Sequence, residues 1–190
     1  MRIVAGIARG RRLLGPTGRA TRPFLERARE AVFSSLGALV ENAAVLDLFA
    51  GTGSLGLEAM SRGAATVTFV ERDRNALDVL RRNIDAVGLG GTVVAGDVER
   101  FVASSAGEGA YDLAFVDPPY DVPLPSVARI LEGLERAMGN GAVVVVHRRR
   151  GEELPVPAGY AVTDRRRYGD SEIWRLVVDE RAADDRGASP

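Results

Sequence analysis

The sequence of 190 residues contains no cysteine, no lysine and a single histidine, His147. Without cysteine the chain cannot form a disulfide, use a thiolate as a nucleophile or bind a metal ion through sulfur. One histidine also makes a histidine-based metal site or a Ser-His-Asp triad hard to assemble. These absences exclude most hydrolase mechanisms, and we expect no metal site.

Long hydrophobic runs are missing as well. No apolar run approaches the ~20 residues that a helix needs to cross a bilayer, and the first residues lack the pattern of a signal peptide. Hydrophobic residues make up 46% of the chain and charged residues 27%, which is typical of globular proteins. We expect a cytoplasmic protein without a membrane partner, and one main domain, since domains usually hold roughly 100 to 200 residues.

Charge is distributed unevenly along the chain, although the net charge is only -1. Eight arginines precede Glu30, and Glu26 is the one acidic residue among them. These arginines are Arg2, Arg9, Arg11, Arg12, Arg19, Arg22, Arg27 and Arg29. A basic N-terminal arm on a nearly neutral body indicates contact with a polyanion.

The hydrophobic pattern predicts alternating strands and helices after an N-terminal extension. Residues 1–42 are expected to form a β-hairpin followed by a helix. The strands are then predicted at 44–48, 66–71, 92–95, 112–116 and 142–147, and the helices near 54–62, 73–87, 97–104 and 125–138. This alternation predicts an α/β fold with a parallel sheet covered on both faces.

The C-terminal part follows a different pattern. The β-rich stretches 159–167 and 172–178 are too close together for a crossover helix, so an antiparallel hairpin at the sheet edge is expected. The last residues are small and charged, which is typical of disorder. We therefore predict an RNA-contacting extension at 1–42, a cofactor-binding catalytic domain at 43–180 and a disordered tail at 181–190.

A glycine-rich turn follows the first predicted strand. Gly51, Gly53 and Gly56 satisfy the G-x-G-x-x-G spacing of dinucleotide-binding turns. The match alone is weak, because S-adenosylmethionine sites and purely structural turns also use glycine here. Asp47 favours S-adenosylmethionine, since a carboxylate beside the loop would repel a pyrophosphate and attract the ligand's ammonium group.

Acidic residues end the next two predicted strands. Glu71 is placed to accept hydrogen bonds from ribose hydroxyls, and Asp97 could accept from an adenine amino group. Ligands bind at the carboxyl edge of such sheets, so Asp47, Glu71 and Asp97 are expected to line one crevice, although each could instead cap a helix. The predicted cofactor-binding residues are Asp47, Phe49, Ala50, Gly51, Gly53, Glu71, Arg72, Asp97, Val98 and Asp117.

The strand near 112–116 runs into the tetrapeptide Asp117-Pro118-Pro119-Tyr120. Two prolines fix the backbone and remove two N–H donors, which leaves an edge rich in acceptors that suits a planar NH₂ group. Hydrogen bonds to that group would direct its nitrogen lone pair toward a methyl donor. Tyr120 would stack on the flipped or unpaired base. We predict that the catalytic residues are Asp117, Pro118, Pro119 and Tyr120.

The combined motifs resemble a known family. The glycine motif with Asp117-Pro118-Pro119-Tyr120 is similar to class I amino-methyltransferases. The segments 2–6, 21–23 and 46–59, together with Ser61-Arg62-Gly63-Ala64, resemble the bacterial small-subunit ribosomal RNA guanine-N2 methyltransferases of the RsmD type. The family usually has threonine or another small polar residue after Thr-Arg-Pro, whereas this chain has Phe24, a departure that leaves the local RNA contact open and does not affect the chemistry.

The resemblance implies a Rossmann-like fold with a seven-stranded mixed sheet, parallel except for an antiparallel terminal hairpin. It also implies S-adenosylmethionine as the cofactor and, as the substrate, a guanine of 16S rRNA in an assembled or partly assembled 30S subunit. The expected RNA-binding residues are Arg11, Arg12, Arg22, Pro23 and Arg29. Segments 147–150 and 165–167 could extend a basic face or simply carry solvated charges.

Three other functions stay open at this point. An N6-adenine methyltransferase acting on DNA or RNA would use the same tetrapeptide, although the chain is short for a separate DNA-recognition domain. A nicotinamide-dependent dehydrogenase would use the glycine motif, but the chain offers no catalytic Lys or Tyr-Lys pair. A non-catalytic RNA-binding protein on the same fold would not need an intact tetrapeptide.

Overall fold

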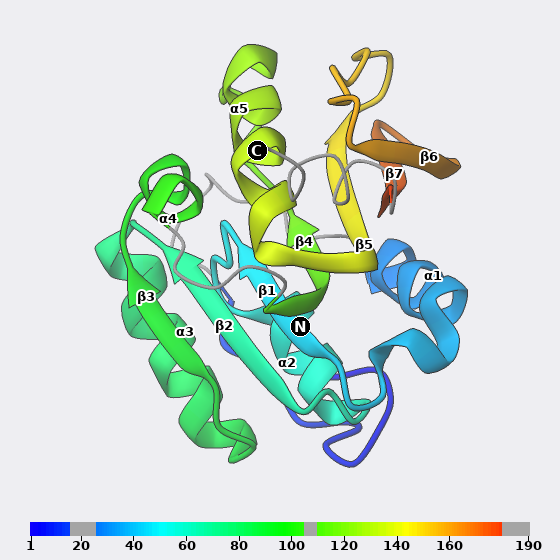
Figure 1. Cartoon of the computed structure of the whole chain (residues 1–190). Helices are drawn as coiled ribbons and strands as arrows, with labels where there is room; N and C mark the ends of the chain where they lie inside the picture. Colours follow the sequence, from blue (N-terminus) through cyan, green and yellow to red (C-terminus); the bar gives the residue numbers. More distant parts are fainter. Residues whose placement is uncertain (16–25, 105–109, 180–190) are drawn as a thin grey trace. The chain divides into compact units, whose positions relative to one another are not determined.

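The computed structural model describes residues 1–15, 26–104 and 110–179 (Figure 1). The chain divides into two compact units, Met1–Asp97 and Val98–Pro190. Three strands of the seven-stranded sheet found in the described residues lie in the first unit and four in the second. The expected α/β class with a mixed sheet is therefore confirmed.

The first unit alternates strands and helices after its N-terminal segment (Figure 1). Its elements are α1 (Glu26–Leu36), the 3₁₀ helix η1 (Gly37–Val40), β1 (Ala44–Leu48), α2 (Ser54–Ser61), β2 (Thr66–Glu71), α3 (Arg74–Val87) and β3 (Thr92–Ala95). The strands are parallel in the order β3-β2-β1. Parallel pairing places the carboxyl ends of β1, β2 and β3, and the loops that follow them, at one edge.

The second unit holds the antiparallel part of the sheet. Its elements are α4 (Val98–Ser104), β4 (Tyr111–Val116), α5 (Leu124–Ala137), β5 (Met138–Arg149), β6 (Tyr160–Tyr168) and β7 (Ser171–Val178). The strand order is β4-β5-β7-β6, with β4 and β5 parallel and the other pairs antiparallel. The predicted terminal hairpin is thus confirmed as β6 and β7.

Most predicted elements agree with the structure to within one or two residues, and β5 is the main exception. The prediction gave 142–147, whereas the strand spans Met138–Arg149. Gly139-Asn140-Gly141 reads as a turn, but Met138 pairs with Tyr111 before an irregularity in the ladder. At the other end Arg148 and Arg149 continue the pairing with β7, which hydrophobicity alone did not indicate.

The N-terminal segment forms a short antiparallel hairpin that packs on α2, as the predicted hairpin required. Arg2 and Arg12 form an antiparallel bridge, and the N–H groups of Ile3 and Leu13 donate to the carbonyls of Arg11 and Met1, each at 3.0 Å. The carboxylate of Glu58 in α2 accepts the backbone N–H groups of Val4 at 2.7 Å and Ala5 at 3.0 Å. These contacts attach the segment to α2 within the unit Met1–Asp97, while the predicted boundary at 42/43 stays a prediction. The predicted tail at 181–190 lies outside the described residues.

Aliphatic side chains form the interior of both units. Val45, Leu46 and Leu48 of β1 are inaccessible in the first unit, as are Leu113 and Ala114 of β4 in the second. Strands buried on both faces require such continuous apolar runs. No helix in the described ranges is long and apolar enough to pass through a membrane.

Candidate active site

The glycine loop after β1 has a backbone that ordinary residues rarely adopt. Phe49, Gly51 and Gly53 have φ values of 58°, 55° and 82°. A positive φ at a non-glycine residue such as Phe49 is uncommon and often marks a functional site. Among the described residues, the one atom within 4 Å of a Cβ atom placed on Gly51 would be the Phe49 carbonyl oxygen, at 3.9 Å. The space beside Gly51 is therefore open, as a bound ligand would require.

The other two glycines of the motif serve packing. A Cβ atom at Gly53 would lie 2.4 Å from Leu80 of α3, and one at Gly56 would lie 2.3 Å from the Phe69 ring of β2. Real Cβ atoms do not approach so closely, so only glycine lets α2 lie against β2 and α3. Close packing therefore explains the glycine at two of the three motif positions, Gly53 and Gly56.

Asp47 connects the end of β1 to the first turn of α2, on either side of the glycine loop. Its side chain is buried, with 1% of the residue exposed, and its Oδ2 accepts the backbone N–H of Gly56 at 2.9 Å. This bond satisfies one of the N–H groups that the start of α2 leaves without a helical partner. Burial does not fit the predicted direct contact with a ligand's ammonium group, so we assign Asp47 to holding the loop and α2 together.

Glu71 lies at the end of β2 and is half-buried. Its Oε2 accepts the Gly51 N–H at 2.8 Å, and its Oε1 accepts the N–H groups of Arg72 and Asp73, each at 2.8 Å. The carboxylate thus joins the glycine loop to the turn after β2. Its exposure and remaining lone pairs leave it able to accept hydrogen bonds from hydroxyl groups.

The other predicted cofactor residues are placed as follows. The Asp97 side chain is 38% exposed, and it forms an ion pair with Arg72, whose guanidinium lies 3.3 Å away. Ala50 is almost buried and donates its N–H to Val70 at 3.1 Å. Val98 begins α4 in the second unit and is buried, so its side chain has no access to a ligand.

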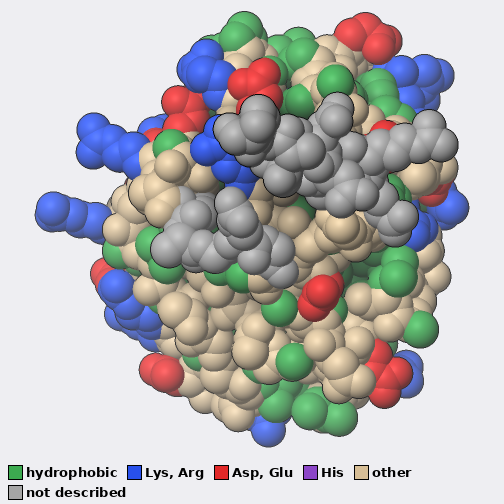
Figure 2. Space-filling view, viewed as in Figure 1, with side chains coloured by type: hydrophobic (Ala, Val, Ile, Leu, Met, Phe, Trp, Pro, Cys, Tyr) green, Lys and Arg blue, Asp and Glu red, His purple; other side chains and the backbone are tan. Residues whose placement is uncertain are grey.

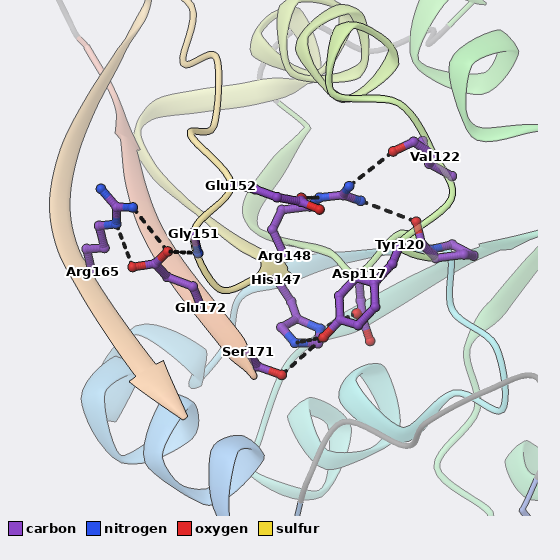
Figure 3. Close-up of polar contacts among 11 residues, drawn as sticks. Asp117, Tyr120, Val122, His147, Arg148, Gly151, Glu152, Arg165, Ser171 and Glu172 are labelled. Atoms are coloured by element: carbon purple, nitrogen blue, oxygen red, sulfur yellow. Dashed lines mark hydrogen bonds and ion pairs between the residues drawn. The ribbon is translucent and has the colours of Figure 1, made fainter. Parts of the chain in front are cut away.

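The tetrapeptide after β4 is held by polar contacts (Figure 3). Asp117 is 28% exposed at its side chain, and its Oδ1 lies 2.6 Å from Nδ1 of His147 on β5. Pro118 is buried and Pro119 is exposed. The acceptor expected at this position is therefore present, accessible and fixed in orientation.

Tyr120 is restrained more than the sequence indicated. Its hydroxyl lies 3.2 Å from Ser171 Oγ and 3.4 Å from His147 Nε2, and the Arg149 guanidinium lies 5.0 Å from its ring centroid. These contacts from β5 and β7 orient the ring, and Figure 3 shows the two partners of its hydroxyl, His147 and Ser171. One edge and one face of the ring already have partners, which limits how a base could stack on it.

Arg148 is a structural residue of the tetrapeptide loop and not part of a basic surface. It is 1% exposed, and its guanidinium donates to the carbonyls of Pro119 at 3.2 Å and Val122 at 3.1 Å, while Glu152 accepts from Nε at 2.7 Å (Figure 3). The basic face considered for 147–150 is thus wrong for this residue, because its charge is balanced internally.

The arginines of β6 are also paired with acids. Arg165 contacts Glu172 through two hydrogen bonds of 2.7 and 3.0 Å, and Arg167 contacts the same carboxylate at 3.1 Å. The hydrogen bonds from Arg165, with those from Arg167 and the Gly151 backbone, lower the pKa of Glu172 to about 2 against the opposing effect of burial. Figure 2 likewise shows described arginine and acidic side chains interspersed on the visible face. In segment 165–167 the arginine charges are therefore balanced by neighbouring acids and do not form a basic face.

The predicted RNA-binding residues have different surroundings. Arg11 and Arg12 are exposed, and Arg11 donates to the Ala86 carbonyl at 2.6 Å. Arg29 is completely buried, donates to the Arg2 carbonyl and lies 3.9 Å from the Glu58 carboxylate. Its burial contradicts the predicted phosphate contact, because a buried guanidinium cannot reach RNA. Arg22 and Pro23 lie outside the described residues.

Sequence reasoning missed one residue that joins two predicted sites. Asn83 of α3 is fully buried, donates to the carbonyls of Thr52 at 2.9 Å and Leu14 at 3.1 Å, and accepts the Leu14 N–H at 2.8 Å. It therefore connects the glycine loop to the N-terminal arm. A polar residue on the apolar face of a predicted amphipathic helix was the available signal, because buried amides are normally hydrogen-bonded.

Several known proteins similar to this chain are named as methyltransferases of small-subunit ribosomal RNA. Ribosomal RNA small subunit methyltransferase D of Escherichia coli K12 is 39% identical over 121 residues, or 63% of this chain and 60% of that protein. The protein of the same name from Haemophilus influenzae is 29% identical over 172 residues, covering 89% of each chain. A hypothetical protein of a Thermus species has a solved structure with a TM-score of 0.79, 32% identity and coverage of 94% of this chain and 99% of that one.

A family model described as Conserved hypothetical protein 95, the RsmD family, matches residues 1–177. The match includes the glycine loop, Glu71 and the tetrapeptide, and it confirms the resemblance inferred from the motifs. The chain belongs to this family and, like its named relatives, is a methyltransferase.

Proposed function

We propose that the protein transfers a methyl group from S-adenosylmethionine to the exocyclic N2 of a guanine in 16S rRNA. The observation that carries this proposal is the accessible carboxylate of Asp117, fixed by His147 directly before two prolines. An oriented acceptor in that setting suits an amino group. The relatives named as small-subunit rRNA methyltransferases support small-subunit rRNA as the substrate.

The first unit provides groups that fit S-adenosylmethionine. The open side of Gly51 would admit the ligand against the loop backbone, and the Glu71 carboxylate would accept from ribose hydroxyls. Asp97 is exposed enough to accept from the adenine amino group, beside Arg72. When bound, this cofactor supplies an electrophilic methyl group and leaves as a neutral thioether.

The second unit provides the groups that act on the base. Asp117 would accept one N–H of the guanine amino group, and the backbone carbonyls of the tetrapeptide would accept the other. These bonds would favour a more tetrahedral nitrogen, with its lone pair directed at the methyl group that the cofactor would supply. After the transfer the methylated nitrogen would lose a proton to water. Most of the acceleration would come from alignment and electrostatics.

The N-terminal arm is proposed to contact RNA through its exposed arginines. Arg9, Arg11 and Arg12 lie on the exposed side of a segment whose Ile3, Ala8 and Leu13 are buried. Such an arm would bind phosphates of 16S rRNA in an assembled or partly assembled 30S particle in the cytoplasm. Phosphate contacts predict activity that falls steeply with salt.

The direct test is nucleoside analysis of 16S rRNA from a strain that lacks the gene. Mass spectrometry should show loss of one N2-methylguanosine per 16S rRNA, and the wild-type gene should restore it while the Asp117→Ala gene should not. Unchanged N2-methylguanosine would contradict the proposal, and loss of N6-methyladenosine would favour the adenine alternative. Calorimetry should show tighter binding of S-adenosylmethionine than of NAD, against the dehydrogenase.

A further inference from the structure

The single histidine of the chain lies beside the proposed reaction site. His147 occupies β5, at the position paired with Ile173 of β7, and 12% of its side chain is exposed. Its Nδ1 is 2.6 Å from Asp117 Oδ1, one of the shortest polar contacts of the second unit. The proposed methyl transfer does not use this imidazole directly, so its short contact with Asp117 must serve another purpose.

The partners of His147 determine which ring nitrogen carries the proton. An ionised carboxylate can only accept, so the Nδ1–H of His147 must donate to Asp117. In the neutral ring Nε2 then accepts, and the Tyr120 hydroxyl lies 3.4 Å from it. Ser171 Oγ, 3.2 Å from that hydroxyl, completes the chain as a donor to Tyr120. In this order each group donates to the next one, and the series ends at Asp117; Figure 3 shows the four side chains.

A carboxylate held in this way is a better acceptor for a substrate. The hydrogen bond at Oδ1 prevents rotation of the Asp117 side chain, and the accessible part of the carboxylate keeps one orientation. Chains of aligned hydrogen bonds also polarise one another. An acceptor that is oriented before the substrate arrives needs no rearrangement in the transition state, which is the basis of electrostatic preorganisation.

We propose that His147 is a positioning residue, which acts on the reacting amino group through Asp117 by donating its Nδ1–H. Tyr120 and Ser171 fix the tautomer that this donation requires. The inference rests on the proposed function for the identity of the substrate, but the tautomer and the contact with Asp117 concern this chain alone.

The activity test compares three replacements of His147. Asparagine can place an N–H close to the position of Nδ1, glutamine reaches the position of Nε2, and alanine provides neither. Single-turnover methylation of 30S particles at saturating cofactor should fall by roughly 10- to 100-fold in His147→Gln and His147→Ala, the scale of a misplaced catalytic group. His147→Asn should keep most of the rate. The affinity for S-adenosylmethionine, measured by calorimetry, should stay unchanged in all three variants.

Equal rates in the wild type and all three variants would overturn the inference, as would equal losses in the asparagine and glutamine variants. If the wild type itself methylates no particle, the proposed function fails and a second measurement decides the inference. With one histidine, the imidazole nitrogens give unique signals in a long-range ¹H–¹⁵N spectrum. The neutral ring should carry its proton on Nδ1, and Asp117→Asn should shift that signal. A proton on Nε2 would overturn the inference independently of activity.

Discussion

The side-chain amide of Asn83 donates a hydrogen bond of 2.9 Å to the backbone carbonyl of Thr52 in the glycine loop. The same side chain exchanges two hydrogen bonds with the backbone of Leu14 in the N-terminal arm. One buried amide on α3 thus supports both the segment proposed to bind cofactor and the segment proposed to bind RNA. Order in the arm and order in the loop therefore depend on the same residue.

Replacement of Asn83 by alanine should destabilise the protein and weaken cofactor binding. The change leaves the buried Thr52 carbonyl without this partner, and a buried unsatisfied group costs roughly 1–3 kcal/mol. It also removes the two part-buried hydrogen bonds with the Leu14 backbone. Urea unfolding and calorimetry with S-adenosylmethionine measure the two effects. Arg82→Ala, on the exposed side of the same helix, is the matched control and should change neither. An Asn83→Ala protein with wild-type stability would refute the assigned role.

Periodicity in the sequence predicted most of the secondary structure, because amphipathic helices and buried strands each carry a recognisable hydrophobic pattern within their own residues. The bounds of β1, β2 and β3 agree with the prediction at every residue. The tetrapeptide and the glycine loop could also be located, since both are short contiguous motifs. The backbone conformation of each motif is determined mainly by glycines or prolines within the motif itself.

Burial of charged side chains could not be predicted in the same way. Arg29 and Arg148 read as surface charges, yet both are buried. Arg29 pairs with Glu58, which lies 29 residues after it, and Arg148 donates not only to the nearby Glu152 but also to the Pro119 carbonyl, 29 residues before it. Pairing between residues so far apart depends on tertiary packing, which local patterns do not encode. The contact between Asp117, directly after β4, and His147 of the neighbouring strand β5 was missed for the same reason.

Glu71→Ala should weaken binding of S-adenosylmethionine by roughly 1.5–3 kcal/mol, the usual contribution of hydrogen bonds to a charged group. The Glu71 carboxylate holds the Gly51 N–H and is proposed to accept from the ribose. Asp78→Ala, a change on the exposed surface of α3, serves as the control. Calorimetry measures both proteins, and an unchanged affinity in Glu71→Ala would show that Glu71 does not contribute to cofactor binding.

Stability should depend on pH through Glu172 in acid. Hydrogen bonds from Arg165 lower the pKa of this carboxyl to about 2 from the ordinary value of 4.5. The unfolded chain therefore binds the proton first, so the stabilisation is present above about pH 4.5 and is lost as the pH falls toward 2.

Urea unfolding between pH 2 and 6 compares the wild type with Glu172→Gln. The difference in the free energy of unfolding between the two proteins should shrink as the pH falls through this range. Glu153→Gln is the control, because the Glu153 side chain is 80% exposed and exposed ion pairs contribute little. A difference that stays constant with pH would mean that the Glu172 pairing does not stabilise the folded chain.

Asp117→Ala should separate chemistry from cofactor binding. The change removes the proposed acceptor for the amino group and leaves Glu71 and Asp97 in place. Methyl transfer to 30S particles should fall by roughly 100-fold or more, the scale of losing one preorganised transition-state hydrogen bond. The affinity for S-adenosylmethionine, by calorimetry, should stay close to that of the wild type. Turnover near the wild-type rate would refute the mechanism.

Tyr120 variants distinguish the ring from its hydroxyl. Tyr120→Ala removes the ring, and loss of a stacked base contact costs about 1–3 kcal/mol. Tyr120→Phe keeps the ring and removes the hydroxyl contacts with Ser171 and His147, so a smaller loss is expected. Single-turnover rates should therefore decrease in the order wild type, Tyr120→Phe, Tyr120→Ala, Asp117→Ala. If Tyr120→Phe is as slow as Tyr120→Ala, the hydroxyl network rather than stacking is what the reaction needs, because both variants lose the network and only one loses the ring.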